Sequence, residues 1–390
     1  MAMRPLTRMI EGMPWSHYFP EQCVRSALAY QPLPGDVFIV SYPKCGTTWL
    51  QYIVYNIYSG GDPTQNMEQF RCSIPFLERG GAERSVLKGR PGAIRTHLPF
   101  DKQLYSPQAR YLYITRNPFD CCVSYYYHTK HFPAYCFEQG TFDDFFELFL
   151  TGDVEFGDYF DHLLPWYAHR SDPNVLFLTY EELKGDTAAV VVKIAGFLGD
   201  EYAARLRREP MLLGRILEVA ALKNMKKAFN CRTFPITKET ATPPTTNHGI
   251  GVEAETSTTQ FVVLTHLVKC EEWDPLPLPF LGLRVPTSGA ADRRKDARSK
   301  PTCVSTTEAK LWLANDQKAE CAKAQDFPAG TSLEELLQRP MTGEFVRKGA
   351  VGDWKGHFSP VQVQRMLGRI KVKTAGSDVM DLWKEFDIPR

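Results

Sequence analysis

The sequence has little net charge, no long apolar run and no closely spaced pair of cysteines. Formal net charge is +1 over 390 residues, so no overall basic field points to nucleic acid or to a membrane surface. The longest apolar stretches, such as residues 37–40 and 261–264, are far shorter than the roughly 20 residues of a membrane-spanning helix. Residues 1–20 also lack the apolar core of a signal peptide. We therefore expect a cytoplasmic protein that binds neither nucleic acid nor membrane.

The ten cysteines are scattered, and none forms a Cys-x-x-Cys pair. This spacing argues against a zinc site, and a chain of this length does not need a disulfide scaffold. Reduced thiols in the cytosol and no bound metal are the expectation.

Apolar runs alternate with helical patterns along the first half of the chain. Residues 36–41 are a short apolar run, and helical spacing begins at Gly46. Alternation of this kind predicts an α/β fold, with a central, mostly parallel sheet flanked by helices in a single domain. Further strands are predicted at 92–96, 110–116 and 174–179, and helices at 142–150, 159–169, 187–198, 360–373 and 378–386.

Residues 230–330 differ from the rest of the chain. They hold a Thr- and Pro-rich stretch and a charged run at 293–300, without sustained periodicity of either kind. We expect an insertion that is disordered or a gene-model artefact rather than a folded regulatory element. The predicted domain is then split between residues 14–229 and 331–390.

The segment at residues 42–49, Tyr-Pro-Lys-Cys-Gly-Thr-Thr-Trp, lies between the first predicted strand and its helix. Gly46 allows a sharp turn, and the amides that follow would open a helix N-terminus that attracts anions. Lys44 adds a positive charge, but it precedes the glycine, so this is not a Walker A loop. The segment, called the phosphate loop below, is predicted to bind phosphate; the alternative is a plain turn with a solvated lysine.

Three further features carry candidate chemistry. Arg116 ends a strand and Ser124 follows two helical turns later, which suits a second phosphate, unless Arg116 merely pairs with Asp120. His97 also ends a strand, where a neutral imidazole could act as a general base, unless it is an ordinary interior histidine. The sequence Arg347-Lys348-Gly349 is typical of an anion-binding loop, or of a solvated turn.

In combination, these segments resemble the cytosolic sulfotransferases, a P-loop-like family that uses 3′-phosphoadenosine 5′-phosphosulfate (PAPS) as donor. The resemblance covers residues from about 14 to 227 and from about 332 to the end. The matching segments are residues 42–49, 95–99, 113–126, 176–182 and 345–355.

The resemblance implies a role for each of these residues. His97 would be the general base, and Lys44 would stabilise the leaving phosphate. The product would be 3′-phosphoadenosine 5′-phosphate (PAP), and no metal would be needed. The residues implied to hold the nucleotide are Lys44, Cys45, Gly46, Thr47, Thr48, Trp49, Arg116, Ser124, Tyr180, Leu222, Arg347, Lys348 and Gly349.

The sequence departs from the family pattern at three places. Cys45 stands where serine is common. A thiol at a helix N-terminus ionises more readily, which predicts redox sensitivity only weakly, and an unreactive small side chain is the favoured alternative. Leu222 occupies a position that usually offers an aromatic ring. The family's dimer motif is degraded at residues 355–364, so a homodimer is possible without being favoured.

The predicted function is transfer of a sulfuryl group to a hydroxyl or amine of a small molecule such as a phenol, alcohol, steroid or biogenic amine. Residues 125–135 are rich in aromatic side chains that could line its pocket. One alternative is a non-catalytic nucleotide-binding relative. The other is a phosphate-loop kinase, against which the arginine at the end of the third strand argues.

Overall fold

The computed structural model describes residues 3–61, 70, 73–86, 91–230 and 331–390. Apart from Asn230, the predicted insertion lies outside the described residues, so the expectations about it remain predictions.

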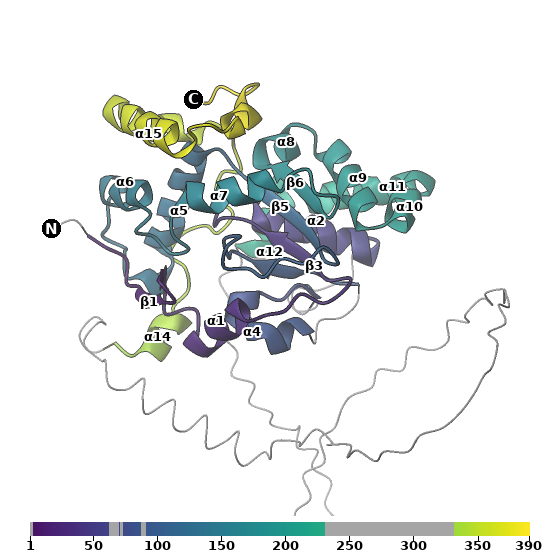
Figure 1. The fold of residues 1–390 in the computed structure, drawn as a ribbon, viewed down its shortest axis with the longest axis horizontal. Helices are drawn as coiled ribbons and strands as arrows, with labels where there is room; N and C mark the ends of the chain where they lie inside the picture. Colours follow the sequence, from purple (N-terminus) through teal and green to yellow (C-terminus); the bar gives the residue numbers. More distant parts are fainter. Residues whose placement is uncertain (1–2, 62–69, 71–72, 87–90, 231–330) are drawn as a thin grey trace, which may run out of the picture. The chain divides into compact units, whose positions relative to one another are not determined.

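Four parallel strands form the central sheet, in the order β4-β3-β5-β6 (Figure 1). Val40 is opposite Thr96 on one side and Tyr113 on the other. Strand β4 lies on one side of β3 and β5 lies on the other, so the order of the strands reverses at β3. In sheets of this kind, ligands bind at such a switch point, outside the carboxyl ends of the strands. The strands are β3 (Val37–Val40), β4 (Ile94–Thr96), β5 (Arg110–Thr115) and β6 (Val175–Thr179).

Both faces of the sheet are covered, as its apolar strands require. Successive residues of a strand point to opposite faces, and Phe38 and Val40 belong to one apolar cluster while Val37 and Ile39 belong to the other. Residues of α5 (Pro118–His131), α6 (Phe142–Thr151) and α7 (Tyr159–Ala168) share the first cluster, and residues of α2 (Thr47–Ser59) and α9 (Thr187–Leu198) share the second. The predicted α/β fold is confirmed.

The other elements surround this core. A hairpin of β1 and β2 lies near the amino terminus, and α15 packs at the carboxyl-terminal end of the chain (Figure 1). These elements are β1 (Arg8–Ile10), β2 (Met13–Trp15), α1 (Glu21–Leu28), α4 (Leu77–Val86), α8 (Tyr180–Gly185), α10 (Asp200–Arg208), α11 (Pro210–Val219), α12 (Leu222–Phe229), α14 (Leu333–Gln338), α15 (Pro360–Lys373) and the 3₁₀ turns η1 (Pro133–Tyr135), η3 (Asp353–Gly356) and η4 (Val379–Trp383).

The helix predicted at residues 378–386 is shorter in the structure and is the 3₁₀ turn η4, Val379–Trp383. Met380 and Trp383 are both buried, and their spacing of three residues matches the 3₁₀ repeat. The Trp383 indole donates a hydrogen bond to Glu181 Oε2 at 2.8 Å, which fixes the turn against α8.

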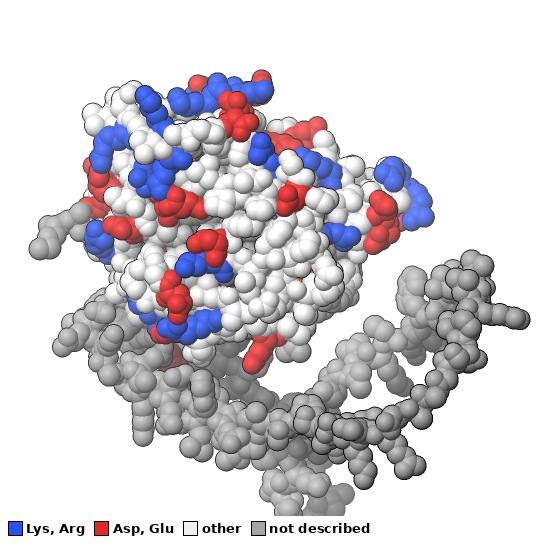
Figure 2. Space-filling model, viewed as in Figure 1, with Lys and Arg blue, Asp and Glu red and all other residues white. Residues whose placement is uncertain are grey.

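Positive and negative side chains are interspersed over the face of the molecule in Figure 2, with no extended field of one sign. No helix among the described residues is long and apolar enough to cross a membrane.

Candidate functional site

The parallel sheet brings four predicted site segments to one edge. The phosphate loop follows β3, His97 follows β4, Arg116 follows β5 and Tyr180 follows β6. Since the carboxyl ends of parallel strands share an edge, residues far apart in sequence become neighbours.

The phosphate loop needs glycine at position 46. Gly46 has a φ of 106° at the start of α2, and a Cβ there would lie 2.9 Å from Cδ2 of Tyr180. Glycine therefore allows both the left-handed turn and the close approach of the Tyr180 ring. Next in the chain, the Thr47 hydroxyl lies 2.6 Å from Ser41 Oγ, which ties the loop to the end of β3.

Lys44 is held close to other cations. Its Nζ lies 4.5 Å from the ring centroid of Phe345. Burial, and then the positive charges of Arg116 and Arg347, lower the pKa of Lys44 to about 8. Among the described residues, no carboxylate forms an ion pair with Lys44. Three positive charges from distant parts of the chain therefore converge, which favours an anion.

Arg116 is almost completely buried and bridges two segments. Its Nη2 donates a hydrogen bond to the Ala350 carbonyl at 2.7 Å, and its guanidinium lies 4.5 Å from the ring centroid of Tyr180. The alternative pairing with Asp120 is a longer contact of 3.8 Å. Its Nε is buried without a partner among the described residues, so a polar group remains for a ligand.

Asp120 anchors the C-terminal loop, residues 345–354, to the start of α5. Its Oδ2 accepts a hydrogen bond from the Gly352 amide at 2.8 Å, and its Oδ1 accepts one from the Trp354 amide at 3.0 Å. The Asn117 side chain donates to the same carboxylate at 2.9 Å and to Glu181 at 2.6 Å. The sequence reasoning did not identify this anchoring role of Asp120. The signal in the sequence that could have indicated this role is the position of Asp120, three residues after Asn117, which caps the helix.

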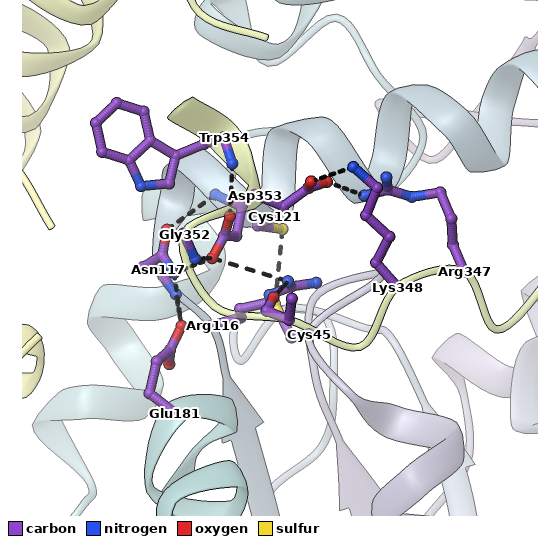
Figure 3. Close-up of polar contacts among 12 residues, drawn as sticks. Cys45, Arg116, Asn117, Cys121, Glu181, Arg347, Lys348, Gly352, Asp353 and Trp354 are labelled. Carbon is purple, nitrogen blue, oxygen red and sulfur yellow. Dashed lines mark hydrogen bonds and ion pairs between the residues drawn. The ribbon is translucent and has the colours of Figure 1, made fainter. Parts of the chain in front are cut away.

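The predicted Arg-Lys-Gly segment lies within this C-terminal loop. Arg347 and Lys348 both pair with Asp353 (Figure 3). Gly349 has a φ of 59°, and a Cβ there would lie 2.7 Å from Cδ1 of Leu222. The structure thus brings Leu222 beside the loop.

The same loop is also fixed to the end of α12. The Asn230 side chain donates to the Val346 carbonyl at 3.0 Å and accepts from the Val346 amide at 2.8 Å. Lys226 and Glu344 add an ion pair of 2.9 Å. Segments on either side of residues 231–330 therefore meet directly.

His97 has its side chain in a defined tautomer. Its Nδ1 lies 2.7 Å from the Ser41 carbonyl oxygen, which can only accept, so Nδ1 carries the hydrogen and Nε2 a lone pair. Burial, and then the charge of Arg95, hold the pKa of His97 well below its usual range. His97 is therefore a neutral imidazole with a proton-accepting Nε2.

The main chain of His97 is fixed as well. The His97 amide donates to Glu78 Oε1 at 2.5 Å, and its carbonyl accepts a hydrogen bond from His162 Nε2 at 3.2 Å. On the other side of that ring, His162 Nδ1 lies 3.0 Å from the Tyr113 hydroxyl. Neither Glu78 nor His162 was identified from the sequence, because no local pattern links either residue to His97.

The remaining predicted residues take different positions. The ring centroids of Trp49 and Tyr180 lie 5.6 Å apart. Nε1 of Trp49 is buried without a hydrogen-bond partner among the described residues. Thr48 and Ser124 are half-buried. Cys45 is completely buried, with its Sγ 3.7 Å from Cys121 Sγ, so the structure favours the inert alternative for this thiol.

A sequence model described as the sulfotransferase domain matches residues 34–250 of this chain. That is more than half of the chain, and it includes the phosphate loop, His97, Arg116 and Tyr180. The chain belongs to the sulfotransferase family.

Individual sulfotransferases agree with this assignment. The chain is 34% identical to sulfotransferase 1B1 of Mus musculus over 202 residues, which are 49% of this chain and 67% of the relative. It is 33% identical to sulfotransferase 1E1 of Homo sapiens over 221 residues, 53% of this chain and 72% of the relative. The predicted enzyme class is thus confirmed at the level of the family.

Solved structures support the same fold. A mouse sulfotransferase complexed with PAP matches with a TM-score of 0.56 at 24% identity, covering 97% of this chain and 98% of that one. Retinol dehydratase in complex with androsterone and PAP matches with a TM-score of 0.57 at 16% identity, covering 95% and 91%. Among the described residues of this sulfotransferase, no group of three or more His, Cys, Asp or Glu side chains could hold a metal ion.

Proposed function

We propose that this chain transfers a sulfuryl group from PAPS to a hydroxyl or amine of a small acceptor in the cytoplasm. One observation carries the proposal: His97 is held as a neutral base at the sheet edge that also carries Lys44 and the phosphate loop. A proton acceptor beside an anion site is what transfer of a charged group to a hydroxyl requires.

The residues present fit a nucleotide with phosphates at both ends. The phosphate loop and Lys44 would hold the 5′-phosphosulfate at the start of α2. Arg116, with its unpartnered Nε, would hold the 3′-phosphate together with Ser124 and the C-terminal loop. Cβ atoms at Gly46 and Gly349 would clash with the side chains of Tyr180 and Leu222, so glycine lets both loops pack closely against these residues. Nε1 of Trp49 is buried without a hydrogen-bond partner among the described residues, and the indole suits a place beside the adenine ring of the nucleotide.

His97 and Lys44 divide the chemistry between them. Nε2 of His97 takes the proton from the acceptor hydroxyl while the acceptor oxygen forms its bond to sulfur. The bond between sulfur and the phosphate oxygen breaks, and Lys44 stabilises the negative charge left on that oxygen. The products are the sulfated acceptor and PAP, and His97 releases its proton afterwards.

The acceptor is proposed to be small and largely apolar. His97 lies between the rings of Phe76 and Phe156, each 5.2 Å from the imidazole centroid. Aromatic side chains of this kind bind flat apolar molecules such as phenols or steroids, while the base selects their hydroxyl.

The base is tested by the variant His97→Ala. Turnover of labelled PAPS with a panel of phenols, steroids and amines should fall at least about 100-fold, as for other general bases, while calorimetric PAP affinity stays within about twofold. His169→Ala is the matched control, because this imidazole pairs with Asp172 and has no role in the proposed chemistry. Unchanged turnover in His97→Ala would remove His97 from this role.

The nucleotide is tested separately by thermal unfolding. PAP should raise the unfolding temperature of the full chain, because a ligand that binds only the folded state stabilises it. ATP with Mg²⁺ should raise it less. The reverse order would favour a phosphate-loop kinase, and PAP binding without turnover of any acceptor would favour a non-catalytic relative.

A further inference from the structure

His128 is an imidazole in an aromatic part of α5, among tyrosine and phenylalanine rings. Its Nδ1 is buried and has no hydrogen-bond partner among the described residues, although the residue as a whole keeps some accessible surface. It belongs to residues 125–135, whose aromatic content is evident in the sequence. The proposed transfer chemistry leaves this imidazole without a role.

His128 lies close to the groups that carry the chemistry. The ring of Phe345 lies 4.5 Å from Lys44 Nζ and 6.2 Å from the His128 centroid, so it contacts both. Burial, followed by the neighbouring Lys44 and His97, holds the pKa of His128 well below its usual range. The imidazole is therefore neutral and lies within electrostatic reach of both groups.

A continuous arc of aromatic rings connects His128 with His97. Phe132 stacks on the His128 ring with centroids 5.5 Å apart and planes at 12°. From Phe132 onward, successive centroids lie 5.1 or 5.2 Å apart. The arc runs through His128, Phe132, Tyr18, Phe19, Phe76 and His97. Both ends of the arc are imidazoles.

The tautomer of His128 follows from its surroundings. A neutral imidazole carries one hydrogen, and an unpartnered buried N–H is rarer in proteins than an unpartnered buried acceptor. The buried Nδ1 therefore holds the lone pair, and Nε2 carries the hydrogen. His128 is thus a hydrogen-bond donor, whereas His97 is a proton acceptor.

We propose that His128 donates a hydrogen bond to a second oxygen of the acceptor, at the end opposite the hydroxyl that His97 deprotonates. The enzyme would then select aromatic acceptors that carry a hydroxyl and a second, hydrogen-bond-accepting oxygen. This inference rests on the proposed sulfuryl transfer, because that reaction defines which hydroxyl faces His97.

The test uses acceptor pairs that differ only in the second oxygen. Methoxyphenols and ethylphenols have nearly the same shape, but only the methoxy group can accept a hydrogen bond. Ortho, meta and para isomers, together with 4′-methoxy- and 4′-ethylbiphenyl-4-ol, cover a range of distances between the hydroxyl and the second oxygen. Affinity for the full chain with bound PAP is measured by calorimetry, and kcat/KM with PAPS as donor.

The wild type should prefer the methoxy member of at least one pair by about tenfold, the contribution of one hydrogen bond. His128→Phe should remove this preference, and His128→Gln, which keeps an N–H donor, should retain part of it. PAP affinity checks the folding of both variants. No preference in any pair, or one that survives His128→Phe, would overturn the proposal.

The two proposals can fail separately. Acceptor affinity does not require turnover, so a methoxy preference without any sulfation would contradict the proposed function and leave the role of His128 standing. Sulfation of both members of every pair at equal rates would do the opposite.

Discussion

The phosphate loop and the C-terminal loop contribute to one site but are positioned in different ways. The phosphate loop is shaped by its own neighbours: β3 ends, Gly46 turns and α2 begins. The C-terminal loop is held by residues far away in sequence, because Asp120, Arg116 and Asn230 each hydrogen-bond its backbone. One half of the site is therefore determined locally, and the other depends on the assembled fold.

Mutations in the two loops should therefore have different effects. A change in the phosphate loop should alter ligand binding with little effect on the rest of the fold, because its conformation is set within a few residues. A change at Asp120 or Arg116, which anchor the C-terminal loop, should alter stability and binding together, since both residues are buried.

The largest effect is expected from Gly46→Ala. A side chain at a φ of 106° is strained, and its Cβ would displace the Tyr180 ring, so PAP affinity should fall about 100-fold. Gly356→Ala is the control, because a Cβ there meets no atom within 4 Å. Calorimetry with PAP measures both variants. A loss of less than about threefold at Gly46 would contradict the need for glycine at this position.

Asp120→Asn should affect both stability and binding. The amide would place a donor against the Gly352 or Trp354 N–H, so the free energy of unfolding should fall by about 3 kcal/mol. Chemical denaturation measures this change, and PAP affinity should fall about tenfold as the C-terminal loop loosens. Asp381→Asn, which removes an exposed partner of Arg390, should cost less than about 1 kcal/mol. Equal effects of the two variants would argue against the anchoring role.

The pH dependence should report the contact between the two loops. The pKa of Lys44 is lowered to about 8, so its charge is present below that pH and lost above it. For free enzyme, kcat/KM for PAPS should therefore fall about tenfold per pH unit on the alkaline side. Burial holds the pKa of His97 well below its usual range, so His97 is neutral throughout the alkaline range and adds no loss there.

Two variants sharpen this measurement. Lys44→Arg should abolish the decline above pH 8, because a guanidinium stays charged. Arg347→Gln should move the decline to higher pH, since removing that positive charge raises the pKa of Lys44. If neither variant shifts the profile, another group is responsible for the alkaline decline.

The smallest effect is expected at Cys45. Its side chain packs against Cys121 and away from solvent, so Cys45→Ser should change PAP affinity by less than about threefold, through burial of one hydroxyl. Mass spectrometry after iodoacetamide treatment should find Cys45 unmodified, with or without PAP. Rapid alkylation that PAP prevents would instead restore the predicted redox sensitivity.

The sequence predicts those parts of the site whose signals are local. A strand followed by Lys44 and Gly46, and strands ending at His97 and Arg116, are patterns within ten residues, and the parallel sheet then gathers them. Which amides Asp120 would accept from, or that His162 would hold the His97 carbonyl, depends on segments that meet only after folding. No spacing in the sequence encodes such contacts, so they required the structure.

The paired hydrogen bonds between Asn230 and Val346 have a consequence for how this enzyme can vary. They join the residue that precedes residues 231–330 to the loop that follows them, next to the ion pair of Lys226 and Glu344. Closing a longer loop costs only logarithmically more free energy. Lineages could therefore lengthen, shorten or replace residues 231–330, and a protein engineer could graft another domain there, while the nucleotide site keeps its geometry.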